Sequence, residues 1–334
     1  MLMLIVVLRT LVEVAGLALI GQGILHLLAG ANREQNVFYR VLKTLTMPVW
    51  RTVRFITPRI VIDRHIGYLA FLLLGLGWYL LVVLGMIFIH SATNVLNDYF
   101  DFKYEVDQPD SPTALYRPHP LIRKILTPRQ LLLEAVVLFM LTAAIGVVLA
   151  WQRSIWALYI GLVGLFASVF YTAGPVKYKY KAFGELSVAL MWGPLMVEGA
   201  YAVQRQALSW KALWISIPFG ALVALVLFAN NFRDVAYDAR RGVKTLSILL
   251  GSKASMAIYV GLIAAAYAAT LAMVVLKVLS PWGLLVFLSM PKAVSLVRTF
   301  LEKIPDAADA LTAQLDTIFG LMLVAALILE RVAW

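Results

Sequence analysis

The chain contains no cysteine among its 334 residues. Disulfide bonds, thiolate metal sites and cysteine nucleophiles are therefore excluded together. Histidine is also scarce, and the four histidines show no spacing typical of paired metal ligands: His26, His65, His90 and His119. Charged residues make up only 14% of the chain, against roughly 25% in soluble domains. The composition thus argues against a soluble domain and excludes sulfur-based chemistry.

Hydrophobic residues are what the chain has in excess. They account for 62% of the sequence, and the mean hydropathy is +0.86. The apolar runs are continuous rather than alternating, which predicts membrane-spanning helices and not a β-barrel. The net charge of +11 is typical of Lys and Arg in the cytoplasmic loops of a membrane protein, so we expect no nucleic-acid partner. We therefore predict an all-α polytopic membrane protein.

Nine segments have the roughly 20 apolar residues that a spanning helix needs. They lie at 3–30, 66–97, 128–150, 154–172, 183–203, 210–230, 254–277, 280–300 and 314–333. The first contains Arg9 and no small-residue cleavage site, so we expect a retained helix rather than a signal peptide. The eighth is the weakest prediction, because Pro291 and Lys292 interrupt it.

Loop charges predict how the bundle is oriented. Lys and Arg concentrate after the second, fourth, sixth and eighth segments, which places those loops in the cytoplasm of a bacterial-type inner membrane. Residues 31–65 do not fit simple alternation. They are basic and contain scattered aromatic residues, which predicts an amphipathic segment on the membrane surface. We expect an atypical N-terminal region at 1–65 and a helical bundle at 66–334.

Acidic residues cluster where the second apolar segment ends, in "SATNVLNDYFDFKYEVDQPDSP" at residues 91–112. If the helix continues to about residue 105, four polar side chains share one face: Asn94, Asp98, Asp101 and Glu105. Asn97 lies close enough in sequence to reach the same ligand. The alternative is a frayed helix end that leads into a solvated acidic loop.

A second acidic cluster follows the sixth segment, in "FANNFRDVAYDARRGVKTLSILLG" at residues 228–251. Asn231, Asp234 and Asp238 lie at helical spacing there, so an acidic face again extends a membrane helix on the predicted cytoplasmic side. Carboxylate and carboxamide oxygens without His or Cys suit Mg²⁺. Five cations are expected on the same side, where they favour a phosphate site: Arg117, Lys177, Lys181, Arg233 and Lys244.

The two clusters resemble the motifs of a known family. "NDYFDFKYE" is similar to the N-D-x-x-D-x-x-x-D motif of the UbiA superfamily of intramembrane prenyltransferases, and "NNFRDVAYDARRGVKTL" to its second motif. The resemblance runs from about residue 88 to the carboxyl end. Within the superfamily, residues 170–204 look most like 1,4-dihydroxy-2-naphthoate polyprenyltransferases of menaquinone synthesis. The first 90 residues loosely resemble a YggT-like two-helix membrane protein.

The resemblance implies a role for each motif residue. Asn97, Asp98 and Asp101 would hold one Mg²⁺, and Asp234 and Asp238 with Asn231 the other. Glu105 stands where the family usually has Asp, and Asp107 offers a substitute. Arg117, Lys177 and Arg233 would contact the diphosphate, with Lys181, Lys244 and Asn94 as further substrate-binding candidates. Tyr171 would lie near the allylic carbon. Glu185 is a candidate for acceptor binding or for helix capping, and Glu198 lies deeper in the fifth segment.

The reaction implied is the Mg²⁺-dependent transfer of a polyprenyl chain from its diphosphate to an aromatic acceptor. The polyprenyl tail would remain in the lipid bilayer while the diphosphate meets the cytoplasmic face. Other acceptors stay open: 4-hydroxybenzoate, haem, a chlorophyllide or a glycerol phosphate lipid. A transporter and a non-catalytic membrane scaffold are the alternatives from other classes, although transporter sites usually lie near the bilayer midplane. Residues 1–65 do not resemble the family's usual first helix, which leaves the acceptor wall undefined.

Overall fold

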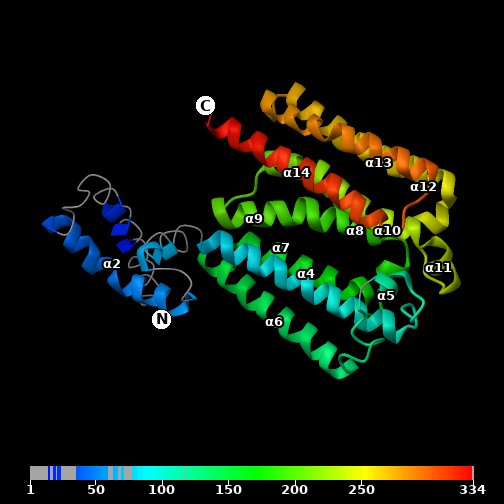
Figure 1. Cartoon of the computed structure of the whole chain (residues 1–334), viewed down its shortest axis with the longest axis horizontal. Coiled ribbons are helices and arrows are strands. Elements are labelled where there is room, and N and C mark those ends of the chain that lie inside the picture. Colours follow the sequence, from blue (N-terminus) through cyan, green and yellow to red (C-terminus); the bar gives the residue numbers. More distant parts are fainter. Residues whose placement is uncertain are drawn as a thin grey trace. The chain divides into compact units, whose positions relative to one another are not determined.

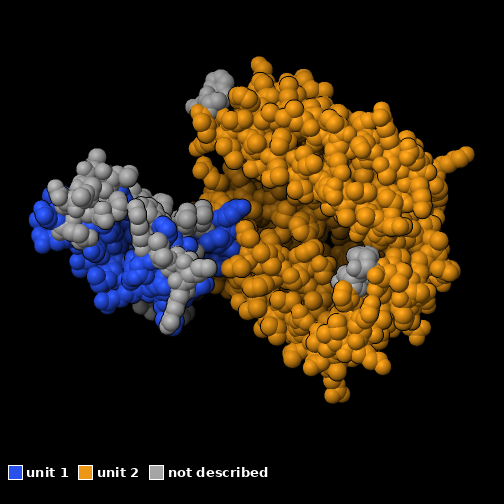
Figure 2. All heavy atoms as spheres, viewed as in Figure 1, with its two compact units in different colours: residues 1–81 blue, residues 82–334 orange. Residues whose placement is uncertain are grey.

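The computed structural model describes residues 14–15, 18–19, 21–23, 35–58, 63–66, 69–70, 77–116 and 118–332. It divides into two units, Met1–Leu81 and Val82–Trp334 (Figure 2). The first predicted span, 3–30, lies largely outside the described residues, as do Arg117 and most of 67–76.

In the first unit the main described element is helix α2 (Val37–Ile56), followed by the short turn η2 (Asp63–His65). The Asn36 side chain caps α2 by accepting the Tyr39 N–H. One side of the helix packs through Val53 into a small apolar cluster with Ile66 and Ala70. Val49 and Trp50 pack against the same cluster. On the other side apolar side chains are exposed, and Phe55 is 90% exposed. This amphipathic helix falls inside the segment 31–65 that the sequence predicted to be amphipathic.

The second unit is all-helical (Figure 1). Its first half contains α4 (Gly77–Lys103, which begins in the first unit), α5 (Pro112–Tyr116), α6 (Pro128–Gln152), α7 (Ile155–Thr172), η3 (Tyr178–Tyr180), α8 (Gly184–Leu190), η4 (Met191–Leu195) and α9 (Met196–Arg205). Its second half contains α10 (Trp210–Arg233), α11 (Val235–Arg240), α12 (Leu246–Val275), η5 (Pro281–Ser289), α13 (Met290–Glu302) and α14 (Ala308–Val332).

Eight helices of the described chain are long and apolar enough to cross a membrane. They coincide with the second to ninth predicted segments, with shifted ends. The eighth is a 3₁₀ stretch, η5, that passes into α13 at Met290, with Pro291 in the first turn, where proline costs no hydrogen bond. The seventh begins earlier than predicted, at Leu246, but Gly251 (φ +74°) breaks it, so the continuous helix starts close to the predicted residue 254.

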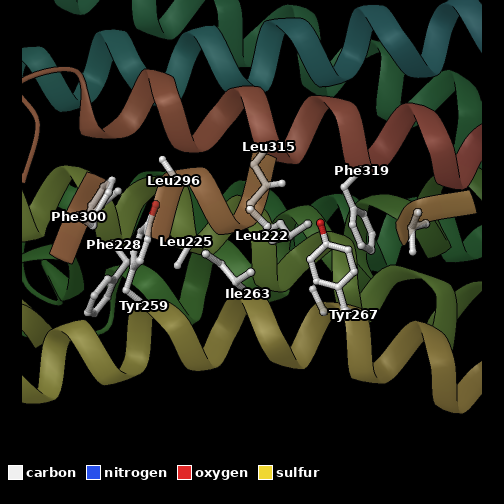
Figure 3. Packing of buried hydrophobic residues seen from close by; sticks show 14 of the residues in the cluster. Leu222, Leu225, Phe228, Tyr259, Ile263, Tyr267, Leu296, Phe300, Leu315 and Phe319 are labelled. Atoms are coloured by element: carbon white, nitrogen blue, oxygen red, sulfur yellow. The ribbon is translucent and has the colours of Figure 1, made fainter. Parts of the chain in front are cut away.

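Side-chain caps fix where several of these helices begin. Thr127 and Gln130 form a reciprocal capping box at the start of α6. Ser154, Ser209 and Thr245 accept backbone N–H groups at the starts of α7, α10 and α12. The buried core lies between α10, α12, α13, η5 and α14 (Figure 3). There the Tyr259 ring stacks on Phe300 at 4.1 Å, and the Tyr267 hydroxyl lies 2.6 Å from the Ser289 hydroxyl.

Outer faces of the bundle are apolar, as a bilayer requires. Large exposed hydrophobic side chains run along α6, among them Leu133, Met140 and Val147. Because water would make these side chains costly, they are consistent with lipid contact. Polar groups instead gather at the carboxyl ends of α4 and α10, which places the acidic motifs at the end of the bundle rather than at its midplane.

Candidate active site

Both acidic motifs line one small cavity of about 60 Å³. The polar residues around it come from three stretches far apart in the chain: Asp101, Asp107, Tyr171, Lys179, Asn230, Asn231, Asp234, Tyr237, Asp238 and Thr245. The carboxyl ends of α4, α7 and α10 meet there with the amino ends of α8 and α12. A wider groove of about 670 Å³ follows α13, but Glu302 is its single acid. The acidic cavity is therefore the candidate site.

In the first motif, α4 remains helical to Lys103, as the shared acidic face requires. Asp98 and Asp101 are buried, with 5% and 3% of their surfaces exposed. The Asp101 carboxylate accepts three hydrogen bonds, from the Asn97 amide (2.8 Å), the Lys179 ammonium (2.5 Å) and the Tyr180 hydroxyl (2.6 Å). Asn97 and Asp101 are thus brought together, while the Asp98 carboxylate lies within 4.8 Å of that of Asp107.

The prediction that Glu105 continues this acidic face is wrong. The helix ends in a Schellman motif, in which the N–H groups of Glu105 and Val106 donate to the carbonyls of Phe102 and Asp101. Glu105 occupies the left-handed position of that motif, with φ +60°, and its side chain is exposed. The same turn brings Asp107, which is buried, back to the cavity. Asp107 therefore takes the place that sequence spacing gave to Glu105.

The second motif is not a simple extension of its helix. Helix α10 ends at Arg233, and Asp234, with φ −90° and ψ 5°, separates it from the short α11. Asp234 and Asp238 still lie one turn apart, since the Asp238 N–H donates to the Asp234 carbonyl at 2.9 Å. The Tyr237 hydroxyl donates to the Val106 carbonyl at 3.0 Å, which links α11 to the loop that carries Asp107.

Arg233 is fully engaged by protein groups. Its guanidinium makes two hydrogen bonds to the Asp234 carboxylate, at 2.7 and 2.8 Å. It also donates to the Asp309 carboxylate, the Asp306 carbonyl and the Asn230 amide oxygen. Such bidentate pairing fixes the orientation of a carboxylate. The structure therefore gives Arg233 the geometry of a clamp on Asp234, whereas the sequence predicted a diphosphate contact.

Charge repulsion at the second motif affects Asp238. Burial, and then the neighbouring Asp234 carboxylate, raise the pKa of Asp238 to about 7. A carboxyl group with so high a pKa is partly protonated near neutral pH. A bound cation would favour its ionised form, which is the expected behaviour of a metal ligand in a metal-free protein.

Lys179 is the cation that sequence reasoning missed. Among the described Lys and Arg residues it alone lines the cavity, and it bonds to both Asn97 (2.7 Å) and Asp101. Burial would lower the pKa of Lys179, but the Asp101 carboxylate outweighs burial and raises it above the ordinary value. The sequence signal for Lys179 was the alternation of Lys and Tyr in "KYKYK", residues 177–181. Only the middle lysine of this stretch lies within the 3₁₀ turn Tyr178–Tyr180, and it is the one that lines the cavity.

The other predicted cations lie elsewhere. The Lys177 ammonium lies 3.7 Å from the centre of the Tyr104 ring, a cation–π contact. Lys181 and Lys244 are exposed, and their backbones form an isolated parallel bridge. None of these three lines the cavity. Arg117 lies outside the described residues.

The remaining candidates divide between the cavity and its supports. Tyr171 lines the cavity, with its hydroxyl against Gly184. Glu185 is buried and accepts a hydrogen bond from the Asn231 amide at 2.8 Å, so it orients a motif residue. Asn94 lies 3.2 Å from the His90 ring and is one turn before Asp98. Glu198 accepts the Ser209 N–H at the start of α10, which is a structural role.

The side chains around the cavity fit Mg²⁺. The candidate ligands in its lining are carboxylate or amide oxygens, from Asp101, Asp107, Asn231, Asp234 and Asp238. Asp98 is outside the lining, but its carboxylate lies within 4.8 Å of that of Asp107. Hard cations such as Mg²⁺ prefer oxygen ligands, and a diphosphate would supply more of them. Two or more carboxylates from each motif around one cavity are costly without a cation. The arrangement can therefore hold divalent cations beside a phosphorylated ligand.

Comparisons with known proteins agree with this geometry. The family model described as the UbiA prenyltransferase family matches residues 67–323. A 1,4-dihydroxy-2-naphthoate octaprenyltransferase of Bacillus subtilis (strain 168) is 31% identical over 288 residues, covering 85% of this chain and 91% of its own length. UbiA prenyltransferase domain-containing protein 1 of Homo sapiens is 31% identical over 245 residues, covering 72% of this chain and 70% of its own.

A further relative and a solved structure extend the comparison. A 1,4-dihydroxy-2-naphthoate octaprenyltransferase of Mycobacterium tuberculosis (strain ATCC 25618 / H37Rv) is 32% identical over 229 residues, covering 68% of this chain and 76% of its own length. The apo structure of a UbiA homolog from Aeropyrum pernix K1 superposes with a TM-score of 0.60 at 17% identity, over 75% of this chain and 90% of that one. At that identity the superposition shows the shared fold alone.

Proposed function

The chain belongs to the UbiA prenyltransferase family, and on that premise we propose that it transfers a polyprenyl chain to 1,4-dihydroxy-2-naphthoate. The donor is a polyprenyl diphosphate, Mg²⁺ is the cofactor, and the reaction is a step of menaquinone synthesis. Family membership makes the chain an integral membrane enzyme. It therefore argues against the alternatives of a transporter and a non-catalytic scaffold. The acceptor, the metal and the cytoplasmic orientation of the site are parts of the proposal.

One observation carries the proposal: acids from both motifs face a single cavity. Asp101 and Asp107 reach it from the end of α4, and Asp234 and Asp238 reach it from the end of α10. Separate solvated acidic loops would have no reason to converge in this way. A diphosphate between the two groups would need cations on both sides, since the carboxylates alone would repel it.

Two sets of oxygens would hold the magnesium ions. Asp98, Asp101 and Asp107 would hold one, and Asn231, Asp234 and Asp238 the other. Bound Mg²⁺ supplies neutralisation of the negative charge that develops on the departing diphosphate. Arg233 orients Asp234, and Glu185 orients Asn231, so these two residues keep the second set in place.

Two side chains of the cavity would act on the donor directly. Lys179 brings a buried positive charge to the cavity, where it would bind diphosphate oxygens and stabilise them as the allylic bond breaks. Tyr171 presents an aromatic ring to the same cavity, and the negative face of such a ring stabilises a carbocation-like isoprenyl end. The tail stays in the bilayer, because each CH₂ kept from water contributes about 0.8 kcal/mol.

The acceptor is inferred from two sources. Relatives that cover most of this chain carry the name 1,4-dihydroxy-2-naphthoate octaprenyltransferase. Residues 170–204, which contribute Tyr171, Lys179 and Glu185, resemble that group in sequence. This segment supplies α8 and one wall of the site, so a likeness there bears on the substrate more directly than a likeness on the lipid-facing helices.

Activity of the purified protein in detergent tests the proposal. We expect farnesyl or longer polyprenyl diphosphate and 1,4-dihydroxy-2-naphthoate to give a prenylated product by mass spectrometry, with Mg²⁺ but not with EDTA. Asp98→Ala and Asp234→Ala should each lower the rate by at least about 100-fold, because each removes a charge that holds metal. Lys253→Ala, at an exposed residue of α12 outside the cavity lining, is the matched control and should keep wild-type activity.

Competing acceptors are part of the same assay. Transfer to 4-hydroxybenzoate, haem, a chlorophyllide or a glycerol phosphate lipid, with none to the naphthoate, would replace the proposed acceptor while keeping the enzyme class. Full activity of Asp98→Ala in EDTA would contradict the metal site itself.

A further inference from the structure

His119 is a wholly buried side chain beside the first acidic motif, with 0% of its surface exposed. Its Nδ1 atom accepts the backbone N–H groups of Leu121 and Ile122, both at 3.3 Å. Its carbonyl accepts the Arg123 N–H at 3.0 Å. The ring thus caps the turn that follows it, in the way that an Asn or Asp side chain caps the start of a helix.

These contacts decide which ring nitrogen carries the proton. Both groups aimed at Nδ1 are donors, so Nδ1 offers its lone pair and the proton is assigned to Nε2. The Nε2 atom lies 3.4 Å from an Asp107 carboxylate oxygen. Among the described residues Nε2 has no partner at full hydrogen-bond geometry, Asp107 included. Nε2–H is therefore in close contact with a carboxylate oxygen of Asp107, without the geometry of a full hydrogen bond.

The same residues could be mistaken for a metal site. Oxygens of Asp98 and Asp107 and a ring nitrogen of His119 lie within 4.8 Å of one another. A histidine that binds metal gives a lone pair from one nitrogen and donates the N–H of the other to a protein acceptor. Here the lone pair is already used by two backbone donors, and the nitrogen nearest Asp107 carries hydrogen. His119 has the wrong polarity for a ligand.

We propose that His119 is a positioning residue for Asp107. Through Nε2–H it holds the Asp107 carboxylate toward the acidic cavity, and through Nδ1 it fixes the turn from which it does so. The inference rests on the proposed function, in which Asp107 is an oxygen ligand of Mg²⁺. In this assignment Nδ1 caps the turn and Nε2 contacts Asp107, so a substitution can remove one function of the ring and keep the other.

His119→Asn and His119→Gln make that separation. The Asn side-chain oxygen takes the place of Nδ1 and keeps the cap, but nothing replaces Nε2. The Gln amide nitrogen takes the place of Nε2 and keeps a donor toward Asp107, but the cap is lost. The measurements are Mn²⁺ affinity by EPR of the free ion and the metal-free thermal midpoint, on full-length protein in detergent.

We expect His119→Asn to weaken Mn²⁺ binding about 10-fold or more, as loss of a partner behind a metal ligand does, with a thermal midpoint near that of the wild type. His119→Gln should show the reverse: near-native Mn²⁺ affinity and a lower midpoint. In an Asp107→Asn background, His119→Asn should cause little additional loss of Mn²⁺ affinity, because its effect acts through Asp107.

Three results would overturn the inference. They are an unchanged Mn²⁺ affinity in His119→Asn, a loss of affinity in His119→Gln as large as that in His119→Asn, and additive losses in the double variant. If His119→Asn failed to fold, the capping assignment would be contradicted, and the comparison of His119→Gln with wild type in both Asp107 backgrounds would still test the donor. Failure of the proposed function is separate: it shows as absent prenyl transfer by the wild type, whatever the Mn²⁺ affinities.

Discussion

Asp101 is held by donors of three different kinds: an amide, an ammonium and a phenol. Asn97 belongs to the same helix, whereas Lys179 and Tyr180 come from the turn before α8. A buried carboxylate needs both a compensating charge and hydrogen bonds to remain ionised. Lys179 provides the charge, so the first acidic motif is paired with a residue about 80 positions away in the chain.

Glu105 offers a test at the scale of a single residue. Its left-handed backbone costs a non-glycine residue roughly 1 kcal/mol, and its side chain is exposed. We expect Glu105→Gly to raise the free energy of unfolding by up to about 1 kcal/mol and to retain activity. Asp107→Ala should instead abolish Mg²⁺-dependent activity.

The measurements are chemical denaturation in detergent and the prenyl-transfer rate. Glu105→Ala is the control that removes the carboxylate and keeps the strained backbone, and it should resemble wild type in both. A loss of Mg²⁺ dependence in Glu105→Ala would restore Glu105 as the metal ligand and contradict the geometry described here.

At the scale of elements, the π-helical turn η4 determines how closely α10 packs against its neighbour. It joins α8 and α9 into one span and packs on α10 through two glycines. A Cβ atom on Gly220 would lie 2.6 Å from the Ala189 carbonyl oxygen and 2.9 Å from the Gly193 Cα. Both neighbours are backbone, so neither can rotate away. Backbone contact this close is typical of small residues between membrane helices.

We therefore expect Gly220→Ala to destabilise the protein by about 1–3 kcal/mol, because α10 must move away from η4. Activity should fall as well, since α10 carries Asn231 at its end. Gly261→Ala is the matched control: a Cβ on Gly261, within α12, meets nothing within 4 Å. It should be neutral or stabilising by up to about 1 kcal/mol. Thermal unfolding in detergent measures both, and equal midpoints for the two variants would contradict the packing argument.

At the scale of the whole molecule, the bundle gathers its charge at one end. Eight described spans have apolar outer faces, while carboxylates of both motifs converge at the carboxyl ends of α4 and α10. This arrangement suits a substrate with an apolar tail and a charged head, because the tail can remain in lipid while the head reaches the acids. It also makes the stability of the fold depend on pH through the half-buried Asp238.

The pH prediction follows from the sign of that shift. The pKa of Asp238 is raised to about 7 in the folded protein, from an ordinary value near 3.8. Metal-free folded protein therefore binds a proton that the unfolded chain has already released, and the stability this provides is lost as pH rises from about 4 through 7. We expect the thermal midpoint of the metal-free protein to decrease as the pH rises from 5 to 8. The increase in the midpoint that Mg²⁺ causes should become larger over the same pH range.

Asp238→Asn cannot titrate, so its metal-free midpoint should vary less with pH than that of the wild type. Asp110→Asn, at a carboxyl group that is 67% exposed, is the matched control and should keep the wild-type slope. Identical slopes in Asp238→Asn and wild type would contradict the assignment.

The sequence by itself determined the class of fold, the positions of the eight described spans and the two acidic motifs. Composition and continuous apolar runs are enough to predict the fold class and the spans. A bilayer requires every spanning segment to be an apolar helix that satisfies its own backbone hydrogen bonds. Motif spacing singled out Asp101, Asp234 and Asp238, which line the cavity, and Asp98, which does not, because residues one turn apart share a face of any helix.

Only the tertiary structure decided which of the remaining charges belong to the site. Lys179 and Lys177 are two residues apart, and a single turn sends one into the cavity and the other onto Tyr104. A Schellman motif replaced Glu105 by Asp107, and packing against the loop before α14 turned Arg233 into a clamp. These outcomes depend on backbone reversals and on contacts between distant segments, and hydrophobic periodicity carries no information about either.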